Sequence, residues 1–219
     1  MLEIISVNHD FLSERKSEEL FALRKEVFKD RLNWSVNCIN GLEFDEYDDH
    51  NANYLFGIMD DTVICGSRLI EMQYPNMIVG TFASCFENFT LPEGNYIESS
   101  RFFVDKARAK KINRERFPIS LLMFLATINY SRNFNYDGIL TIVSHSMFTI
   151  LERSGWKFTV ISKGLSEKNE SIYLLNLPND VENQNILIDG ITKYAPIERS
   201  QLKEWPLICS VAAAEAVIS

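Results

Sequence analysis

The chain carries near its middle the stretch Glu98-Ser99-Ser100-Arg101-Phe102-Phe103-Val104-Asp105. Phe and Val favour strands, so we expect a β-strand here, although two charged residues lie inside the pattern. A charged side chain in a buried strand must be paired or used, because burying an isolated charge is unfavourable by several kcal/mol. The stretch therefore predicts a core strand that places the Glu98 carboxylate in a cleft, and the remaining sequence is expected to build that cleft.

A basic segment follows this strand. Residues 101–116 contain seven basic and two acidic side chains, a local charge of +5, which leaves −13 for the rest of a chain whose net charge is −8. The acidic total argues against nucleic acid as a partner. A basic surface on an acidic protein can steer an acidic partner, but a solvated helix face would account for the same charges equally well.

The composition is that of an ordinary soluble globular protein: of 219 residues, 46% are hydrophobic and 24% are charged. No apolar run approaches the roughly 20 residues that span a bilayer, and no signal peptide is evident at the N-terminus. Cys38, Cys65, Cys85 and Cys209 lack CxxC spacing, which predicts reduced thiols in a cytoplasmic protein. The three scattered histidines have no zinc-site spacing, so we expect no bound metal.

Hydrophobic periodicity predicts the remaining elements. We expect strands at 2–7, 53–59, 62–72, 98–105, 139–144, 156–161 and 171–177, and helices at 13–29, 118–136, 146–154 and 181–191. A turn at Asp60-Asp61 joins the second and third strands, and Pro118 takes the first position of its helix. The order predicts an α/β protein with one mixed-sheet α-β-α domain over residues 1–219. Beyond residue 178 the pattern weakens, and we expect the extreme C-terminus to be mobile.

The segment from residue 30 to 51 is expected to be a long acidic loop, with five carboxylates between Glu43 and Asp49. Asp45 and Asp48, three residues apart, can face one way and receive a cation, while Trp34 can cover a sulfonium or ammonium group by cation–π attraction. A calcium loop would need the EF-hand spacing that this segment lacks, and a merely solvated loop remains an alternative. Arg68, in the middle of a predicted strand, requires a partner that this loop can supply.

Several of these residues together resemble the LuxI-type acyl-homoserine-lactone synthases. The matching positions are Arg24-x3-Phe28-x5-Trp34, Asp45-x2-Asp48, Arg68 and Glu98-Ser-Ser-Arg101-Phe-Phe-Val-Asp. The likeness runs from the N-terminus to about Pro178. It implies a fold like that of the Gcn5-related N-acyltransferases, although a fold does not fix the chemistry. From spacing alone, core packing of Phe28 and a surface ion pair of Arg24 are the simpler interpretations.

The resemblance also implies an activity. The enzyme would join S-adenosylmethionine, a consumed substrate rather than a cofactor, to an acyl chain carried on acyl carrier protein, and would release methylthioadenosine. Glu98 is the expected base for the attacking amine. The implied catalytic residues are Glu98, Arg101, Asp45 and Asp48, and the implied substrate-binding residues are Arg24, Phe28, Trp34, Arg68, Phe82 and Phe103. Which of these charges touch substrate and which are structural is left open by the sequence.

Two more groups of residues follow from the resemblance. The acyl pocket is expected to include Ser99, Thr127, Thr141, Val143, Met147 and Leu177. A hydroxyl at Thr141 goes with 3-oxoacyl chains in the family, whereas Thr is also simply common in strands. The basic segment would dock the acidic carrier protein through Lys106, Arg108, Lys110 and Lys111.

The sequence leaves two alternative functions open. An acetyl-CoA N-acetyltransferase would cradle pyrophosphate with a Gly-rich loop at a helix N-terminus, and residues 101–116 contain no glycine. A non-catalytic module that binds an acidic protein would explain the basic segment, but it leaves Trp34 and the acidic loop without a role.

Overall fold

The structure is a computed structural model that describes residues 1–112 and 117–210. Within these ranges a mixed sheet of eight strands has the order β10-β1-β4-β5-β6-β7-β9-β8. Its strands are β1 (Leu2–Asn8), β4 (Asn53–Met59), β5 (Thr62–Glu71), β6 (Tyr96–Val104), β7 (Gly138–Ser144), β8 (Thr159–Leu165), β9 (Ser171–Leu177) and β10 (Leu207–Cys209). The predicted α/β class with a mixed sheet is confirmed. Arg114, Arg116 and the mobile tail predicted for residues 211–219 lie outside the described ranges.

The sheet changes character at its centre. β6 and β7 run parallel, whereas the other neighbouring strands pair antiparallel. The parallel pair is short, because the register covers only Tyr96↔Gly138, Ile97↔Ile139 and Glu98↔Leu140. Both strands continue beyond these pairs, so they part immediately after Glu98. The strand predicted at residues 98–105 is therefore part of β6, and its pairing with β7 ends at Glu98.

Four of the five helices in the described ranges correspond to predicted ones, and α2 was not predicted as a helix. The five are α1 (Glu14–Arg24), α2 (Lys106–Ile112), α3 (Ile119–Asn133), α4 (His145–Ser154) and α5 (Val181–Thr192). Ser13 caps α1 by accepting the Lys16 amide, but after Arg24 the helix continues as a π-helix, η2 (Lys25–Arg31). Pro118 is the N-cap of α3 rather than its first helical residue.

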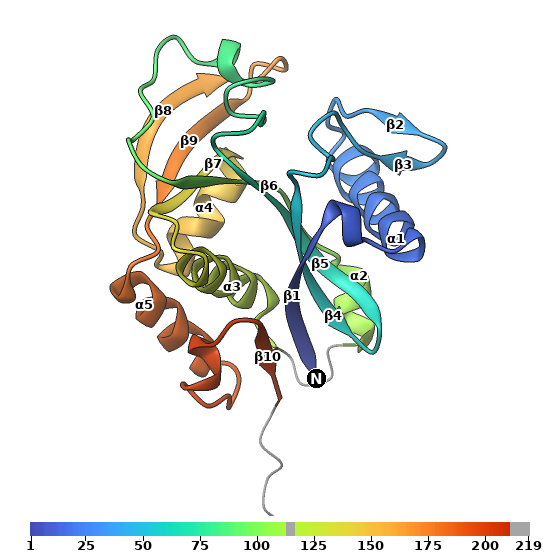
Figure 1. Cartoon of the computed structure of the whole chain (residues 1–219), viewed down its shortest axis with the longest axis vertical. Coiled ribbons are helices and arrows are strands. Elements are labelled where there is room, and N and C mark those ends of the chain that lie inside the picture. The colour runs from blue at the N-terminus through green and yellow to red at the C-terminus, as the bar shows by residue number, and fades with distance from the viewer. Residues whose placement is uncertain (113–116, 211–219) are drawn as a thin grey trace, which may run out of the picture.

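The two faces of the sheet are covered differently. Figure 1 shows α3, α4 and α5 on one side of the molecule, and α1 with the small β2 (Cys38–Ile39) and β3 (Leu42–Glu43) sheet on the other. The larger apolar core lies between the sheet and α3 and α5. Two smaller clusters, one around α1 and one under the segment after β5, cover the opposite face. Each face of β6 is therefore enclosed by a different part of the chain.

Turn chemistry accounts for the hairpin between β4 and β5. Asp60 and Asp61 both have left-handed φ angles, +48° and +58°, which Asp tolerates better than most residues. The predicted turn is confirmed. Further along, the strand predicted to begin at Trp156 begins at Thr159, because Trp156 is buried among core side chains and its indole N–H donates to the Pro178 carbonyl at 2.8 Å.

The C-terminal segment contributes more than its sequence pattern indicates. The weakly predicted helix is confirmed as α5, and β10 then pairs with β1 at the edge of the sheet through Leu2↔Cys209 and Ile4↔Leu207. The buried Asn129 side chain of α3 donates to the carbonyl oxygens of Leu202 and Glu204, at 2.9 and 3.0 Å. These contacts fasten the segment between α5 and β10 to the main core.

Candidate active site

The alternation of β6 divides its side chains between the two faces of the sheet. Ile97 packs in the core with α3, whereas Glu98 faces the opposite side, together with its partner Leu140. Further along β6 a bulge breaks the register with β5, and Arg101 within it has a left-handed φ of +54°. That conformation is unfavourable for a non-glycine residue by about 1–2 kcal/mol, so the surrounding contacts must hold it.

The Glu98 carboxylate is buried, with 1% of the residue exposed. Its Oε2 accepts the Met77 amide at 2.7 Å. Burial raises the pKa of Glu98 above the ordinary glutamate value, while Arg68, the Ser100 hydroxyl and the amides of Met77 and Ile78 act in the opposite direction. Among the residues described by the structure, no basic side chain forms an ion pair with Glu98. A carboxyl whose pKa is raised, and which has no ion-pair partner among the described residues, is a stronger base than an exposed carboxylate.

A set of buried ion pairs lies beside this carboxylate, between the acidic loop and the scaffold. Arg24 of α1 donates from Nε to Glu43 at 2.5 Å and from Nη1 to Asp48 at 2.7 Å. The Arg24 and Glu43 side chains are 1% and 0% exposed. Burial opposes the charge on Arg24, but the two carboxylates outweigh it and raise its pKa. The pair therefore remains ionised in the interior.

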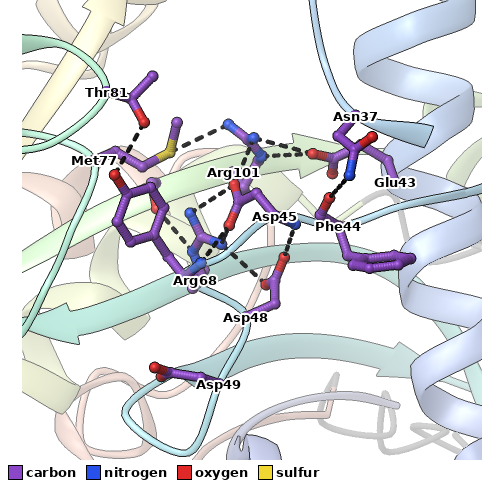
Figure 2. Close-up of polar contacts among 12 residues, drawn as sticks. Asn37, Glu43, Phe44, Asp45, Asp48, Asp49, Arg68, Met77, Thr81 and Arg101 are labelled. Atoms are coloured by element: carbon purple, nitrogen blue, oxygen red, sulfur yellow. Dashed lines mark hydrogen bonds and ion pairs between the residues drawn. The ribbon is translucent and has the colours of Figure 1, made fainter. Parts of the chain in front are cut away.

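Two further arginines complete the network (Figure 2). Arg68 contacts Asp45 at 2.5 Å and Asp48 at 3.0 Å, and Arg101 contacts Asp45 at 2.7 Å and Glu43 at 3.0 Å. Each of the three carboxylates thus touches two arginines. Three positive and three negative charges balance, so three of the five carboxylates of the acidic loop are neutralised by arginine. We name this set of six side chains, Arg24, Glu43, Asp45, Asp48, Arg68 and Arg101, the ion-pair network.

The acidic loop supplies the partner that the position of Arg68 in a strand required. Asp45 and Asp48 face the same way, and the cations that they receive in this structure are arginines. Burial would raise the pKa of Asp48, whereas Arg24 and Arg68 together hold it well below its usual value. Tyr54 also donates its hydroxyl to Asp48 at 2.9 Å. These contacts position the loop, and among the described residues the buried Glu98 beside them has no ion pair with an arginine.

The aromatic candidates line the same side of the sheet. Trp34, half-buried, stacks on Phe28 with ring centroids 5.2 Å apart and an interplanar angle of 18°. The Arg101 guanidinium carbon lies 5.7 Å from the Phe28 ring centroid on the same cluster. Phe82 packs at the border of the two smaller apolar clusters, and Phe103 is buried in the cluster with Phe28. Phe28 is thus a core residue that supports Trp34, as its spacing suggested.

The residues assigned to an acyl pocket lie mainly on the other face of the sheet. The register places Ser99, Thr141, Val143 and Leu177 on the face that α3 and α4 cover. Thr127 belongs to α3 and Met147 to α4. The Thr141 hydroxyl donates to the Ser99 carbonyl at 2.7 Å, so it bridges β6 and β7 just beyond their last paired residues. Glu98 and this group therefore meet at the point where the two strands part.

The predicted docking residues are not equivalent. Lys106, Lys110 and Lys111 on α2 are exposed. Arg108 instead contacts Glu19 of α1 at 2.9 Å and Asp105 at 3.2 Å, so it joins two helices. The exposed part of the basic segment within the described residues is thus reduced to three lysines.

With this geometry in hand, comparison with known proteins identifies the chain. The sequence profile of the autoinducer synthases matches residues 8–187, which is most of the chain. The chain belongs to the autoinducer synthase family. An acyl-homoserine-lactone synthase of Pectobacterium parmentieri is 61% identical over 94% of this chain and 95% of its own length. One from Pectobacterium carotovorum subsp. carotovorum is 58% identical over 99% and 100%. The protein is therefore an acyltransferase with acyl-homoserine-lactone synthase activity.

Solved structures show the same fold. The acyl-homoserine-lactone synthase LasI aligns with a TM-score of 0.75 and 21% identity, over 85% of this chain and 94% of that one. The CoA-dependent synthase BjaI, solved with S-adenosylmethionine and isopentyl-CoA, aligns with a TM-score of 0.75 and 20% identity, over 87% and 90%. An acyl-CoA N-acyltransferase from Pseudomonas aeruginosa reaches a TM-score of 0.53 at 15% identity, over 81% and 99%. The predicted likeness to N-acyltransferases is confirmed at the level of the fold.

Sequence reasoning did not select two members of the synthase's buried polar set. Glu43 lies at the junction of Arg24 and Arg101, and Tyr54 contacts Asp48. The alternation of Glu43, Phe44 and Asp45 was the available signal, because carboxylates two residues apart in an extended segment point the same way. The arginine partners lie 19 to 58 residues away along the chain, so no local pattern could assign the pairs.

The remaining features concern metals and membranes. Within residues 1–112 and 117–210, no group of three or more His, Cys, Asp and Glu side chains is arranged to hold a metal ion. None of the helices in those ranges has the length and apolar character to cross a membrane. Two open surface hollows of about 490 and 550 Å³ lie against β8, and no candidate catalytic residue lines either of them.

Proposed function

We propose that the synthase transfers a 3-oxoacyl chain from acyl carrier protein to S-adenosylmethionine. The methionyl amine attacks the thioester carbonyl, an amide bond forms, and the carrier thiol leaves as the C–S bond breaks. The methionyl carboxylate then attacks its own γ-carbon, which closes the lactone and expels methylthioadenosine. The products are an acyl-homoserine lactone, methylthioadenosine and free carrier protein. Substrates of this kind occur in the cytoplasm, where we place the enzyme.

The buried Glu98 carboxylate is the observation that carries this proposal. An ammonium group must lose a proton before it can attack a carbonyl carbon, and a positioned base typically contributes 10²–10⁴-fold to such a step. Glu98 lies where β6 and β7 part, has a raised pKa, and faces no ion-pair partner among the described residues. It acts as the base, directly or through one water molecule.

The other residues of the site prepare the two substrates. The Trp34 face offers cation–π attraction to the sulfonium, worth about 0.5–2 kcal/mol. Arg68 and Arg101, held by the ion-pair network, lie on the same side of the sheet as Glu98 and are the proposed partners of the substrate carboxylate. Strand amides near Phe103, next to the bulge, are candidate donors to the oxyanion of the tetrahedral intermediate. Support for S-adenosylmethionine also comes from relatives solved with it or with methylthioadenosine.

The overall proposal is tested by product release. Purified enzyme is mixed with S-adenosylmethionine and either 3-oxoacyl carrier protein or the matching 3-oxoacyl-CoA, and methylthioadenosine and lactone are measured by mass spectrometry. The proposal expects both products in equal amounts and a higher kcat/KM with the carrier protein. Preference for the CoA thioester would reject the proposed donor, because at least one solved relative is described as CoA-dependent.

The exposed lysines of α2 favour the carrier protein as donor. We expect Lys110→Glu with Lys111→Glu to raise KM for the carrier-bound substrate about tenfold at low salt, because like charges then oppose docking. KM for the CoA thioester should stay nearly constant. The matched control is Lys193→Glu with Lys203→Glu, the same charge change at exposed positions outside the basic segment. Equal losses with both thioesters would show that docking is not the cause.

Selection of a 3-oxo chain depends on Thr141. Its hydroxyl donates to the Ser99 carbonyl in the unliganded structure and must turn to donate to a substrate carbonyl. A hydrogen bond of this kind is worth about 1 kcal/mol, so Thr141→Val should lower the preference for 3-oxoacyl over unsubstituted chains about fivefold. Thr141→Ser, which keeps the hydroxyl, should retain the preference. A competition assay with both chains measures the ratio, and an unchanged ratio in the valine variant would remove this assignment.

A further inference from the structure

The segment after β5 contacts Glu98, and the buried side chain of Asn76 holds its backbone in a turn. Asn76 is fully buried, and its Oδ1 accepts the amides of Ile78 and Val79 at 3.1 and 3.3 Å. Its Nδ2 donates to the Tyr74 carbonyl at 2.8 Å. The side chain therefore closes an Asx-type turn on both sides. We name residues 74–82 the amide loop.

The amide loop presents a backbone donor to the carboxylate. The Met77 amide, directly after Asn76, donates to Glu98 Oε2 at 2.7 Å, whereas the next amide, that of Ile78, donates to the Asn76 oxygen at 3.1 Å. Because the Asn76 side chain holds the residues on both sides of it, the direction of the Met77 amide depends on the turn that this side chain makes. A hydrogen bond to the ionised form of a carboxyl favours that form and lowers its pKa.

The loop is also tied to the ion-pair network. The Met77 sulfur accepts a hydrogen bond from Arg101 Nη1 at 3.3 Å, as Figure 2 shows. The Thr81 hydroxyl lies 3.1 Å from that of Tyr47, whose ring contacts Arg68. These two contacts involve the side chains of Met77 and Thr81. The backbone amide of Met77 is oriented instead by the turn that Asn76 makes.

We propose that Asn76 is a positioning residue for the reaction: it fixes the amide loop so that the Met77 amide holds the Glu98 carboxylate aligned. The inference rests on the proposed role of Glu98 as the base. Arg68 of β5 is the charged group that faces Glu98, while its neighbours Ile70 on β5 and Leu140 on β7 are apolar. Arg68, the Ser100 hydroxyl and the Met77 amide act together against the effect of burial on the Glu98 pKa, and the Met77 amide is the contribution that Asn76 controls.

The test is the pH dependence of kcat. In Asn76→Ala the Met77 amide loses its support, so we expect the acid limb of the profile to move up by about one pH unit and the rate below that limb to fall about tenfold. Asn76→Ser keeps an acceptor that makes the same turn more weakly, and it should restore part of the shift. A loss of rate that is equal at every pH would overturn the inference, because that is the result of a purely structural role.

Two controls separate this from general damage. Asn129→Ala removes another buried asparagine, on α3, whose side chain bonds to Leu202, Glu204 and Gln184, and it should lower Tm without moving the acid limb. Titration of the Glu98 carboxyl by ¹³C NMR, with Glu98→Gln to identify its signal, gives the pKa without any substrate. An unshifted Glu98 pKa in Asn76→Ala would reject the inference. Full activity of Glu98→Gln would instead reject the proposed base and leave the NMR result standing.

Discussion

Replacing Glu98 by glutamine is expected to lower kcat by about a hundredfold or more while changing KM for S-adenosylmethionine little. The amide keeps the size of the side chain and an oxygen for the Met77 amide, but it cannot take a proton. In the wild type the rate should rise with pH through a limb that lies above the ordinary glutamate value, because burial raises the pKa of Glu98. The variant should lose this limb, which a pH profile of initial rates measures.

The same variant should not unfold the protein. A carboxyl whose pKa is raised on folding contributes stability below its unfolded pKa and loses that contribution as the pH rises through its folded pKa. At neutral pH the ionised Glu98 carboxylate therefore lowers the free energy of unfolding, so Glu98→Gln should leave Tm unchanged or raise it. Glu71→Gln is the control, since Glu71 accepts a hydrogen bond from Tyr136 at 2.8 Å and has no proposed part in catalysis. A Glu98→Gln enzyme with wild-type kcat would refute the assignment of the base.

The second large effect is expected on stability, from Glu43→Ala. This change leaves Arg24 and Arg101 facing each other without the carboxylate between them, at a site where Glu43 has no exposed surface. Removing one partner of a buried pair is unfavourable by about 3–5 kcal/mol, because the other charge stays buried. For a protein of this size that corresponds to a fall in Tm of about 6–20 °C, which calorimetry measures directly.

An exposed ion pair provides the comparison. Asp61 contacts Arg15 at 2.8 Å, but both side chains are about two-thirds exposed, so Asp61→Asn should change Tm by no more than about 2 °C. Asparagine also tolerates the left-handed backbone at that turn. If Glu43→Ala had as small an effect as this control, the ion-pair network would not be a stabilising feature of the acidic loop.

The sequence predicted those elements whose residue pattern lies within one short segment. The strand around Glu98 alternates, is rich in Phe and Val, and contains a charge that had to be used, so both β6 and its carboxylate were predictable. The hairpin at Asp60 and Asp61 was predictable from turn chemistry. The acyl-pocket residues came from the family resemblance, because nothing in their local spacing distinguishes Thr141 from any other strand threonine.

The features that were missed depend on contacts between distant segments. Glu43 on β3 forms its ion pairs only when α1, which carries Arg24, and β6, which carries Arg101, pack against it. The π-helix η2 begins at Lys25 without any break in the helical spacing that precedes it. β10 is three residues long, shorter than a periodic pattern needs to be recognised, and its existence follows from the open edge that β1 offers. In each case tertiary contacts, rather than local preference, select the structure.

The pairing of β10 with β1 has a consequence for the newly made protein. β1 is synthesised first, yet one of its edges is covered only when Leu207–Cys209 have been made, about 200 residues later. At translation rates of about 5–20 residues per second, that interval lasts about 10–40 s. During that interval the outer edge of β1 exposes unpaired backbone N–H and C=O groups. Other nascent chains on the same messenger RNA can pair with them. Ribosome stalling before residue 207 would therefore favour aggregation of this enzyme over its maturation.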